Sequence, residues 1–317
     1  MFKGDTLIFS KKKHALNNDS SNSHNVISSN KSKDFIENLW KYIFLGCASI
    51  AILSIITITI FIFAKGSPAI FEIGVFDFLF SAKWKPSAEK YGIFAMIIGS
   101  IYATIGAITI GVPIGIFTAV FLAEIAPDWL TKIMRPSVEL LAGIPSVVYG
   151  FFGLIVIVPI IDSMPGSGSS GSSLLAACII LGIMILPTII SITETSLRSV
   201  PKEYKEGALA IGASHMQTIF TVMIPAAKSG ILTGVILGIG RAIGETMAVI
   251  LVCGNTVKIP LSIFDRFRPM TANIALEMSY AFGLHQEALL ATGVILFIFI
   301  MILNLILNSL THKVGDR

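Results

Sequence analysis

The chain alternates between long apolar runs and short polar connections. Most runs are about as long as the helix that a bilayer core requires, so the pattern predicts an all-α, polytopic membrane protein. The second run is too long for one straight span, and Gly111-Val-Pro-Ile-Gly115 is predicted to break or kink it, which would allow a seventh span. We predict six transmembrane helices, from the runs 42–64, 91–123, 140–161, 174–192, 231–252 and 288–311.

The polar segments divide the chain into parts. Lys and Arg are more frequent in the connections that share a side with the N-terminus, so both termini are predicted to be cytoplasmic. The N-terminal segment is rich in Ser, Asn and Lys without apolar periodicity, which favours disorder. The predicted parts are a disordered tail (1–40), a first transmembrane helix (41–64), an external segment (65–92), a membrane core (93–311) and a cytoplasmic end (312–317).

Composition narrows the function classes. Hydrophobic residues make up 54% and charged residues 13%, against about 25% charged in a soluble domain, which excludes a soluble enzyme. The net charge is only +4 and the basic residues are scattered along the chain, so we expect no nucleic-acid partner. The five histidines and three cysteines lack the spacing of a metal site. We expect no metal and no cofactor bound by this chain.

One polar insertion, residues 195–228, stands out between the fourth and fifth runs. Residues 202–211 consist of good helix formers, and Gly212 is predicted to end that helix at a positive φ. A second short helix is predicted over residues 214–223. Two short helices joined at a glycine would form a knob that fits a groove on a partner.

This insertion is similar to the coupling-loop signature of ABC-type importer permeases, which reads Glu-Ala-Ala, three residues, Gly, nine residues, Ile-x-Leu-Pro. The resemblance implies that the loop docks into a cytoplasmic ATPase and transmits its closure. The chain departs from the signature with Gly207 for alanine, and with two aliphatic exchanges. Glu206 can pair with Lys202 or with a basic residue of the partner. The matching residues are Glu206, Gly207, Ala208, Gly212 and Pro225.

Two charges, Arg241 and Glu245, interrupt the fifth apolar run. A charge at the bilayer centre costs about 2.5–3.5 kcal/mol, so such residues pair or line a wet cavity. They are four positions apart and would share a helix face. One interpretation is a structural ion pair; the other is a substrate path in which Glu245 holds Arg241 ready for an oxyanion. Glu139 can likewise cap a helix, pair with Arg135 or face the passage.

Further segments resemble the PstC-type phosphate permeases, from residue 65 to the end of the sixth run. The resemblance implies a MetI-like ABC importer fold in the bacterial inner membrane and a path for inorganic phosphate. It also implies three partners: a PstA-type permease, a cytoplasmic ATPase dimer and an external phosphate-binding protein. Residues 66–90 would either dock that protein or lie in the membrane interface as an aromatic anchor. The segments begin at Gly99, Gly111, Phe121, Val138, Gly240 and Met270.

Other functions remain as alternatives. Arg241 does not separate phosphate from another oxyanion such as sulfate or molybdate. An ion-coupled carrier without an ATPase is a third possibility, against which the coupling loop argues. No intramembrane nucleophile or acid–base constellation is visible, so the chain is expected to be a transport subunit and not an enzyme, with ATP hydrolysis left to the partner.

Overall fold

The computed structural model describes residues 5–164 and 171–315. The chain forms two units, Met1–Phe61 and Ile62–Arg317, and each is described by itself. The ends of the predicted tail and of the C-terminal segment, residues 1–4 and 316–317, lie outside the described residues.

In the second unit the elements after α1 are α2 (Val75–Phe80), β1 (Trp84–Lys85), η1 (Pro86–Ala88), β2 (Lys90–Tyr91), α3 (Phe94–Val120), η2 (Phe121–Ile125), α4 (Asp128–Gly143), α5 (Ser146–Phe152), η3 (Gly153–Ile157), α6 (Val158–Asp162), α7 (Leu174–Arg198), α8 (Lys202–Ala210), α9 (His215–Thr218), η4 (Ile219–Met223), α10 (Ile224–Ala226), α11 (Lys228–Gly244), α12 (Met247–Val252), α13 (Met270–Glu277) and α14 (Leu284–Gly315).

Helix α1 (Asp5–Ile73) contains the predicted first transmembrane segment, and its part Phe35–Ile73 is long and apolar enough to cross a membrane. The structure also has residues 5–40 as helix, whereas the composition predicts disorder there. No Pro or Gly lies between Gly4 and Gly46, so no residue in this stretch forces the backbone out of the helix.

Among the described residues, four helices are long and apolar enough to span a membrane, and the number is six if each of two bent pairs forms one span. The pairs are Asp128–Gly143 with Ser146–Asp162, bent by 99°, and His215–Ala226 with Lys228–Gly244, bent by 70°. The predicted all-α polytopic fold is confirmed. The fourth predicted run corresponds to α7.

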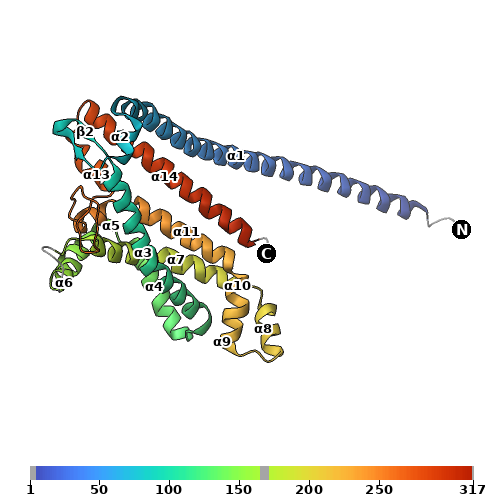
Figure 1. The fold of residues 1–317 in the computed structure, drawn as a ribbon. Helices are drawn as coiled ribbons and strands as arrows, with labels where there is room; N and C mark the ends of the chain where they lie inside the picture. The colour runs from blue at the N-terminus through green and yellow to red at the C-terminus, as the bar shows by residue number, and fades with distance from the viewer. Residues whose placement is uncertain (1–4, 165–170, 316–317) are drawn as a thin grey trace. The chain divides into compact units, whose positions relative to one another are not determined.

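Helices α3 and α7 form the central contact of the second unit (Figure 1). Helix α3 continues through Pro113 as one helix, so of the predicted break or kink at Gly111–Gly115 the break, and with it a seventh span, is wrong. The glycines serve close packing instead. A Cβ at Gly111 would lie 2.8 Å from the Gly182 carbonyl oxygen, and one at Gly115 would lie 2.8 Å from Ile189, so only glycine lets the two helices approach this closely.

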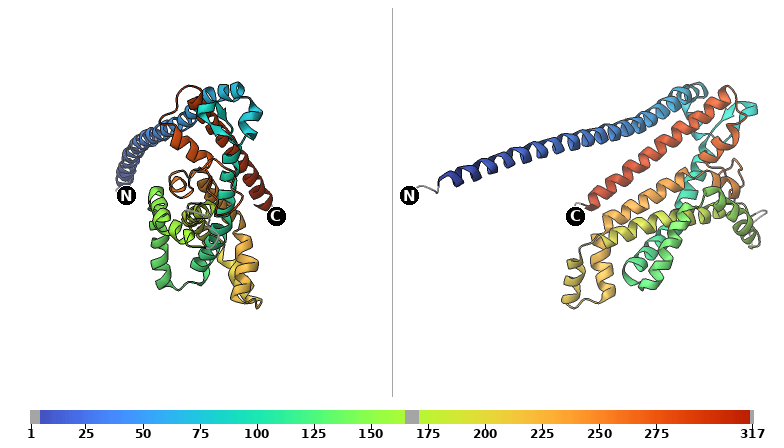
Figure 2. Two further views of the ribbon diagram at one scale, coloured as in Figure 1. Left: turned by 60° about the vertical axis from the view of Figure 1, so that its left-hand side comes forward. Right: turned by 180° about the vertical axis from the view of Figure 1, so that it is seen from behind.

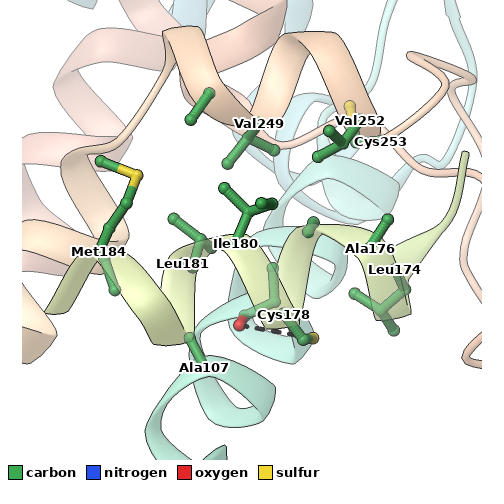
Figure 3. Packing of buried hydrophobic residues seen from close by; sticks show 14 of the residues in the cluster. Ala107, Leu174, Ala176, Cys178, Ile180, Leu181, Met184, Val249, Val252 and Cys253 are labelled. Carbon is green, nitrogen blue, oxygen red and sulfur yellow. Dashed lines mark hydrogen bonds between the residues drawn. The ribbon is translucent and has the colours of Figure 1, made fainter. Parts of the chain in front are cut away.

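Buried side chains of α7 bind it to its neighbours. Ile180 and Leu181 are at most 2% exposed and lie toward Val249 and Val252 of α12 (Figure 3). On the other side, the Cys178 thiol lies 3.8 Å from the Ala103 carbonyl oxygen of α3. The core therefore holds both α12 and α3 against α7. This fixes the frame in which the charged residues of the fifth run are placed.

The two ends of the second unit differ. At one end α8 and α9 lie side by side and project from the bundle (Figures 1 and 2); we call this the knob, residues 202–226. At the other end, Trp84 pairs with Tyr91 in a short antiparallel hairpin, and α13 packs against α14. We call this the hairpin end. Charged and hydrogen-bonding side chains form clusters at both ends of the second unit and between them.

Candidate functional site

The fifth apolar run is broken at its two charges. Helix α11 ends at Gly244, Glu245 is extended at φ −70° and ψ 126°, and α12 begins at Met247. The prediction of one continuous span over residues 231–252 is therefore wrong. The physical reason is a local cap: a Glu245 carboxylate oxygen accepts a hydrogen bond of 3.1 Å from the Ala248 backbone N–H, which satisfies a donor in the first turn of α12.

Arg241 and Glu245 do not share a helix face, because α11 ends between them. Among the described residues no ion pair joins the two, so the predicted pair is wrong. Arg241 is exposed in the last turn of α11, and Glu245 is half-buried. An exposed guanidinium beside a break offers planar donors that suit an oxyanion, and Glu245 supports the backbone there.

A second broken helix lies beside the helix that follows this break. The bend between α4 and α5 lies at Ile144–Pro145, where the Tyr149 hydroxyl donates to the Leu141 carbonyl at 2.7 Å. Helix α5 then packs on α12: a Cβ at Gly150 would lie 2.9 Å from Ala248 Cα. The helices that follow the two interruptions therefore pack against each other. Both interruptions lie within apolar segments, where irregular backbone is found at cavities and binding sites.

The knob has the predicted form. Helix α8 ends before Gly212, which has φ +92°. Ser214 then starts α9 with a capping box, its side chain accepting from the Gln217 backbone N–H while the Gln217 side chain accepts from the Ser214 N–H. Of the motif residues, Glu206, Gly207, Gly212 and Pro225 are exposed and Ala208 is buried.

An ion pair that the sequence does not reveal fastens the knob. Lys205 Nζ lies 2.6 Å from a carboxylate oxygen of Glu124, whose side chain is only 7% exposed. His215 Nε2 lies 3.1 Å from the Glu124 carbonyl oxygen. Both helices of the knob are thus tied to the end of the α3–η2 segment. Glu206, by contrast, is exposed and takes no part in these contacts.

A second charged cluster lies near the base of the knob. Glu194 accepts from both Arg135 and Arg198, the latter at 3.0 Å, and Arg198 also donates to the Leu122 carbonyl. Arg135 therefore pairs with Glu194 of α7, while Glu139 is exposed and lines a cavity of about 370 Å³ beside the cluster. The charges in this lining balance, which gives the cavity no preference for an anion.

A third polar cluster lies at the hairpin end, and no sequence motif predicts it directly. The buried Glu277 accepts from Trp84 Nε1 at 2.8 Å, from His285 Nε2 at 2.9 Å and from Arg268 Nη1 at 2.6 Å. Burial raises the pKa of Glu277, but these three hydrogen bonds and the charge of Arg268 outweigh it, so the pKa lies below its ordinary value. Only the segment that begins at Met270, which resembles the PstC-type permeases, pointed to this region.

No group of three or more His, Cys, Asp or Glu residues that could hold a metal ion occurs in the described part of the chain. The polar features of the described residues are the break at Glu245, the knob, and the Glu194 and Glu277 clusters.

Comparison with known proteins identifies the family. Residues 111–316 match the model of the binding-protein-dependent transport system inner membrane component. A probable ABC transporter permease, YqgH of Bacillus subtilis (strain 168), is 41% identical over 92% of this chain and 96% of its own length. The phosphate transport system permease protein PstC of Mesorhizobium japonicum (strain LMG 29417 / CECT 9101 / MAFF 303099) is 38% identical over 82% of this chain and 85% of its own.

A solved structure supports the fold. The MetNI methionine ABC transporter in an inward-facing conformation aligns with a TM-score of 0.53 and 19% identity, over 70% of this chain and 94% of that chain. The predicted MetI-like permease fold is confirmed, and the relatives are permease subunits. The chain belongs to the binding-protein-dependent transport system inner membrane components, and within them to the PstC-type permeases.

Proposed function

We propose that this chain is the permease subunit of an ATP-driven importer that carries inorganic phosphate across the bacterial inner membrane. Both termini would face the cytoplasm. The observation that carries the proposal is the knob: two capped helices joined at a positive-φ glycine, at the spacing of the coupling-loop signature. Phosphate is proposed because PstC of Mesorhizobium japonicum is named a phosphate transport permease.

The knob is the proposed contact with a cytoplasmic ATPase dimer. Large apolar side chains are exposed there, although water is an unfavourable neighbour for them. Tyr204 is 55% exposed, Ile211 88% and Met216 51%. A cleft of the ATPase would cover these residues, and the ion pair between Lys205 and Glu124 would pass its motion to α3. ATP hydrolysis is assigned to that partner, and this chain would bind no cofactor.

The substrate path is proposed to run beside the break at Glu245, with Arg241 as the residue that meets the anion. A PstA-type permease would supply the other wall, and an external phosphate-binding protein would deliver the cargo. Glu245 shapes the backbone at the break instead of holding Arg241. A single exposed arginine binds an oxyanion weakly enough to release it, as passage requires.

A direct test uses the complete transporter in lipid nanodiscs. We expect its ATPase rate to rise when phosphate-loaded binding protein is added, because the cargo-loaded partner favours the closed ATPase. Stimulation by sulfate- or molybdate-loaded protein instead would assign another oxyanion. If the cytoplasmic ATPase does not bind the permease pair, the assignment as an ATP-driven importer is contradicted and an ion-coupled carrier is favoured.

A further inference from the structure

Helix α12, the short helix after the break, is held at both of its ends by one segment, Arg268–Glu277. At its start, the Thr271 hydroxyl donates to the Glu245 carbonyl at 3.3 Å. At its end, Arg268 Nε donates to the Asn255 carbonyl at 2.9 Å, and the Asn255 side chain donates to the Ile250 carbonyl at 2.8 Å. The position of α12 therefore depends on where this segment lies.

The segment is in turn held by the hairpin end. The Glu277 carboxylate accepts hydrogen bonds from the Trp84 indole N–H of the β1–β2 hairpin and from His285 at the start of α14. It also pairs with Arg268, whose side chain is 17% exposed. Trp84 is 8% exposed and its ring contacts Tyr91 edge-on. The Glu277 carboxylate thus joins the hairpin, α13 and α14 at one point.

Helix α13 is the link between these two sets of contacts. Thr271 and Glu277 are six residues apart on it, about 9 Å along the axis. The helix is also fixed sideways, since the Met270 backbone N–H donates to the Ser100 hydroxyl of α3 at 3.1 Å. Thr271 and Glu277 lie at the two ends of one continuous helix, so a displacement of Glu277 would be carried to Thr271 and from there to the break.

We propose that Trp84, Glu277 and Thr271 are positioning residues for the break at Glu245, and that α13 passes the state of the hairpin surface to it. The hairpin exposes Lys83, Lys85 and Lys90, so the external binding protein, if it displaces the hairpin, would act on α12 through these contacts. The inference rests on the proposed function in taking this break as part of the transport path and in naming the external binding protein.

The test combines two conservative variants, Trp84→Phe and Thr271→Val. The first removes the indole N–H that Glu277 accepts, and the second removes the hydroxyl that reaches Glu245. Trp40→Phe is the matched control, because Trp40 lies in the first unit, outside this network. All variants are studied in the assembled complex, with melting temperature measured alongside, so that loss of folding is recognised.

Hydrogen–deuterium exchange of the peptide containing Ala248 is the first readout, and it requires no cargo. We expect exchange to rise about fivefold in each single variant and no further in the double variant, since coupled sites are not additive. The second readout is phosphate uptake per complex, where kcat should fall by a similar factor at unchanged KM. The Trp40→Phe complex should match the wild type in both.

Two results would overturn the proposal. One is wild-type exchange at Ala248 in Trp84→Phe, which would mean that the hairpin does not reach the break. The other is multiplied effects in the double variant, which would make the two contacts independent. If exchange behaves as expected but the wild-type complex takes up no phosphate, the proposed cargo is wrong and the linkage stands.

Discussion

Gly207 and Gly212 lie on the same knob, and both are exposed with no atom within 4 Å of a built Cβ. Replacing each by alanine therefore introduces no collision and isolates the backbone effect. Gly207 is inside α8, whereas Gly212 has φ +92°. The two substitutions should act on stability with opposite signs.

The magnitudes follow from these conformations. Alanine in a helix interior is favoured over glycine by about 0.5–1 kcal/mol, so Gly207→Ala should stabilise α8. A non-glycine residue forced into a sparsely populated region costs about 1–3 kcal/mol, so Gly212→Ala should strain or reshape the turn. If docking of the ATPase requires the native turn, that cost weakens binding by about 5- to 150-fold.

The assay is a titration of the nanodisc-embedded permease pair with the ATPase, together with hydrogen exchange over the knob. Gly212→Ala should bind the ATPase more weakly and exchange faster in α8. Gly207→Ala, which restores the Glu-Ala-Ala form of the signature, should bind as the wild type does and exchange more slowly. Wild-type binding by Gly212→Ala would refute the reasoning, as would equal damage by both variants.

Three further outcomes follow from the packing and the charges. Gly111→Ala should lower the free energy of unfolding by about 1–3 kcal/mol, because the added Cβ collides with the Gly182 carbonyl oxygen. Gly143→Ala is the control: a Cβ there meets open space, so the melting temperature in detergent should stay unchanged or rise. Glu194→Gln should lower the free energy of unfolding by about 1.5–3 kcal/mol, since two arginines lose their carboxylate; an unchanged melting temperature would contradict the pairing. Because the pKa of Glu277 is lowered in the folded state, its contribution is complete above the ordinary value of about 4.3 and is lost as the pH falls through the folded value. The melting temperature of the wild type should therefore fall more steeply below about pH 4.5 than that of Glu277→Gln, and parallel curves would count against this cluster.

Local chemistry made the knob and α7 predictable. Gly212 ends a helix because glycine alone reaches its φ at little cost, and this follows from the residue type. An uninterrupted apolar run such as residues 174–192 specifies one span by length alone. Both features depend on contacts within a few residues along the chain.

The break at Glu245 could not be read in the same way. No proline marks it, and hydropathy is indifferent to whether a glutamate ends one helix or caps the next. At Gly111–Gly115 the opposite error occurred: the sequence predicts a break where the helix is continuous. A Gly-x-Pro-x-Gly pattern favours a break, and only the close approach of α7 shows that the glycines serve helix packing instead. The pair of Lys205 with Glu124 joins residues 81 positions apart, and periodicity carries no information about such distant partners.

Uptake of radiolabelled phosphate tests the central claim most directly. The permease pair, the ATPase and the binding protein would be reconstituted in proteoliposomes with ATP on the ATPase side. The account predicts accumulation of phosphate that requires ATP, is not competed by sulfate, and falls sharply in Arg241→Gln. Phosphate flux through this chain without ATP or partners, or wild-type uptake by Arg241→Gln, would contradict it.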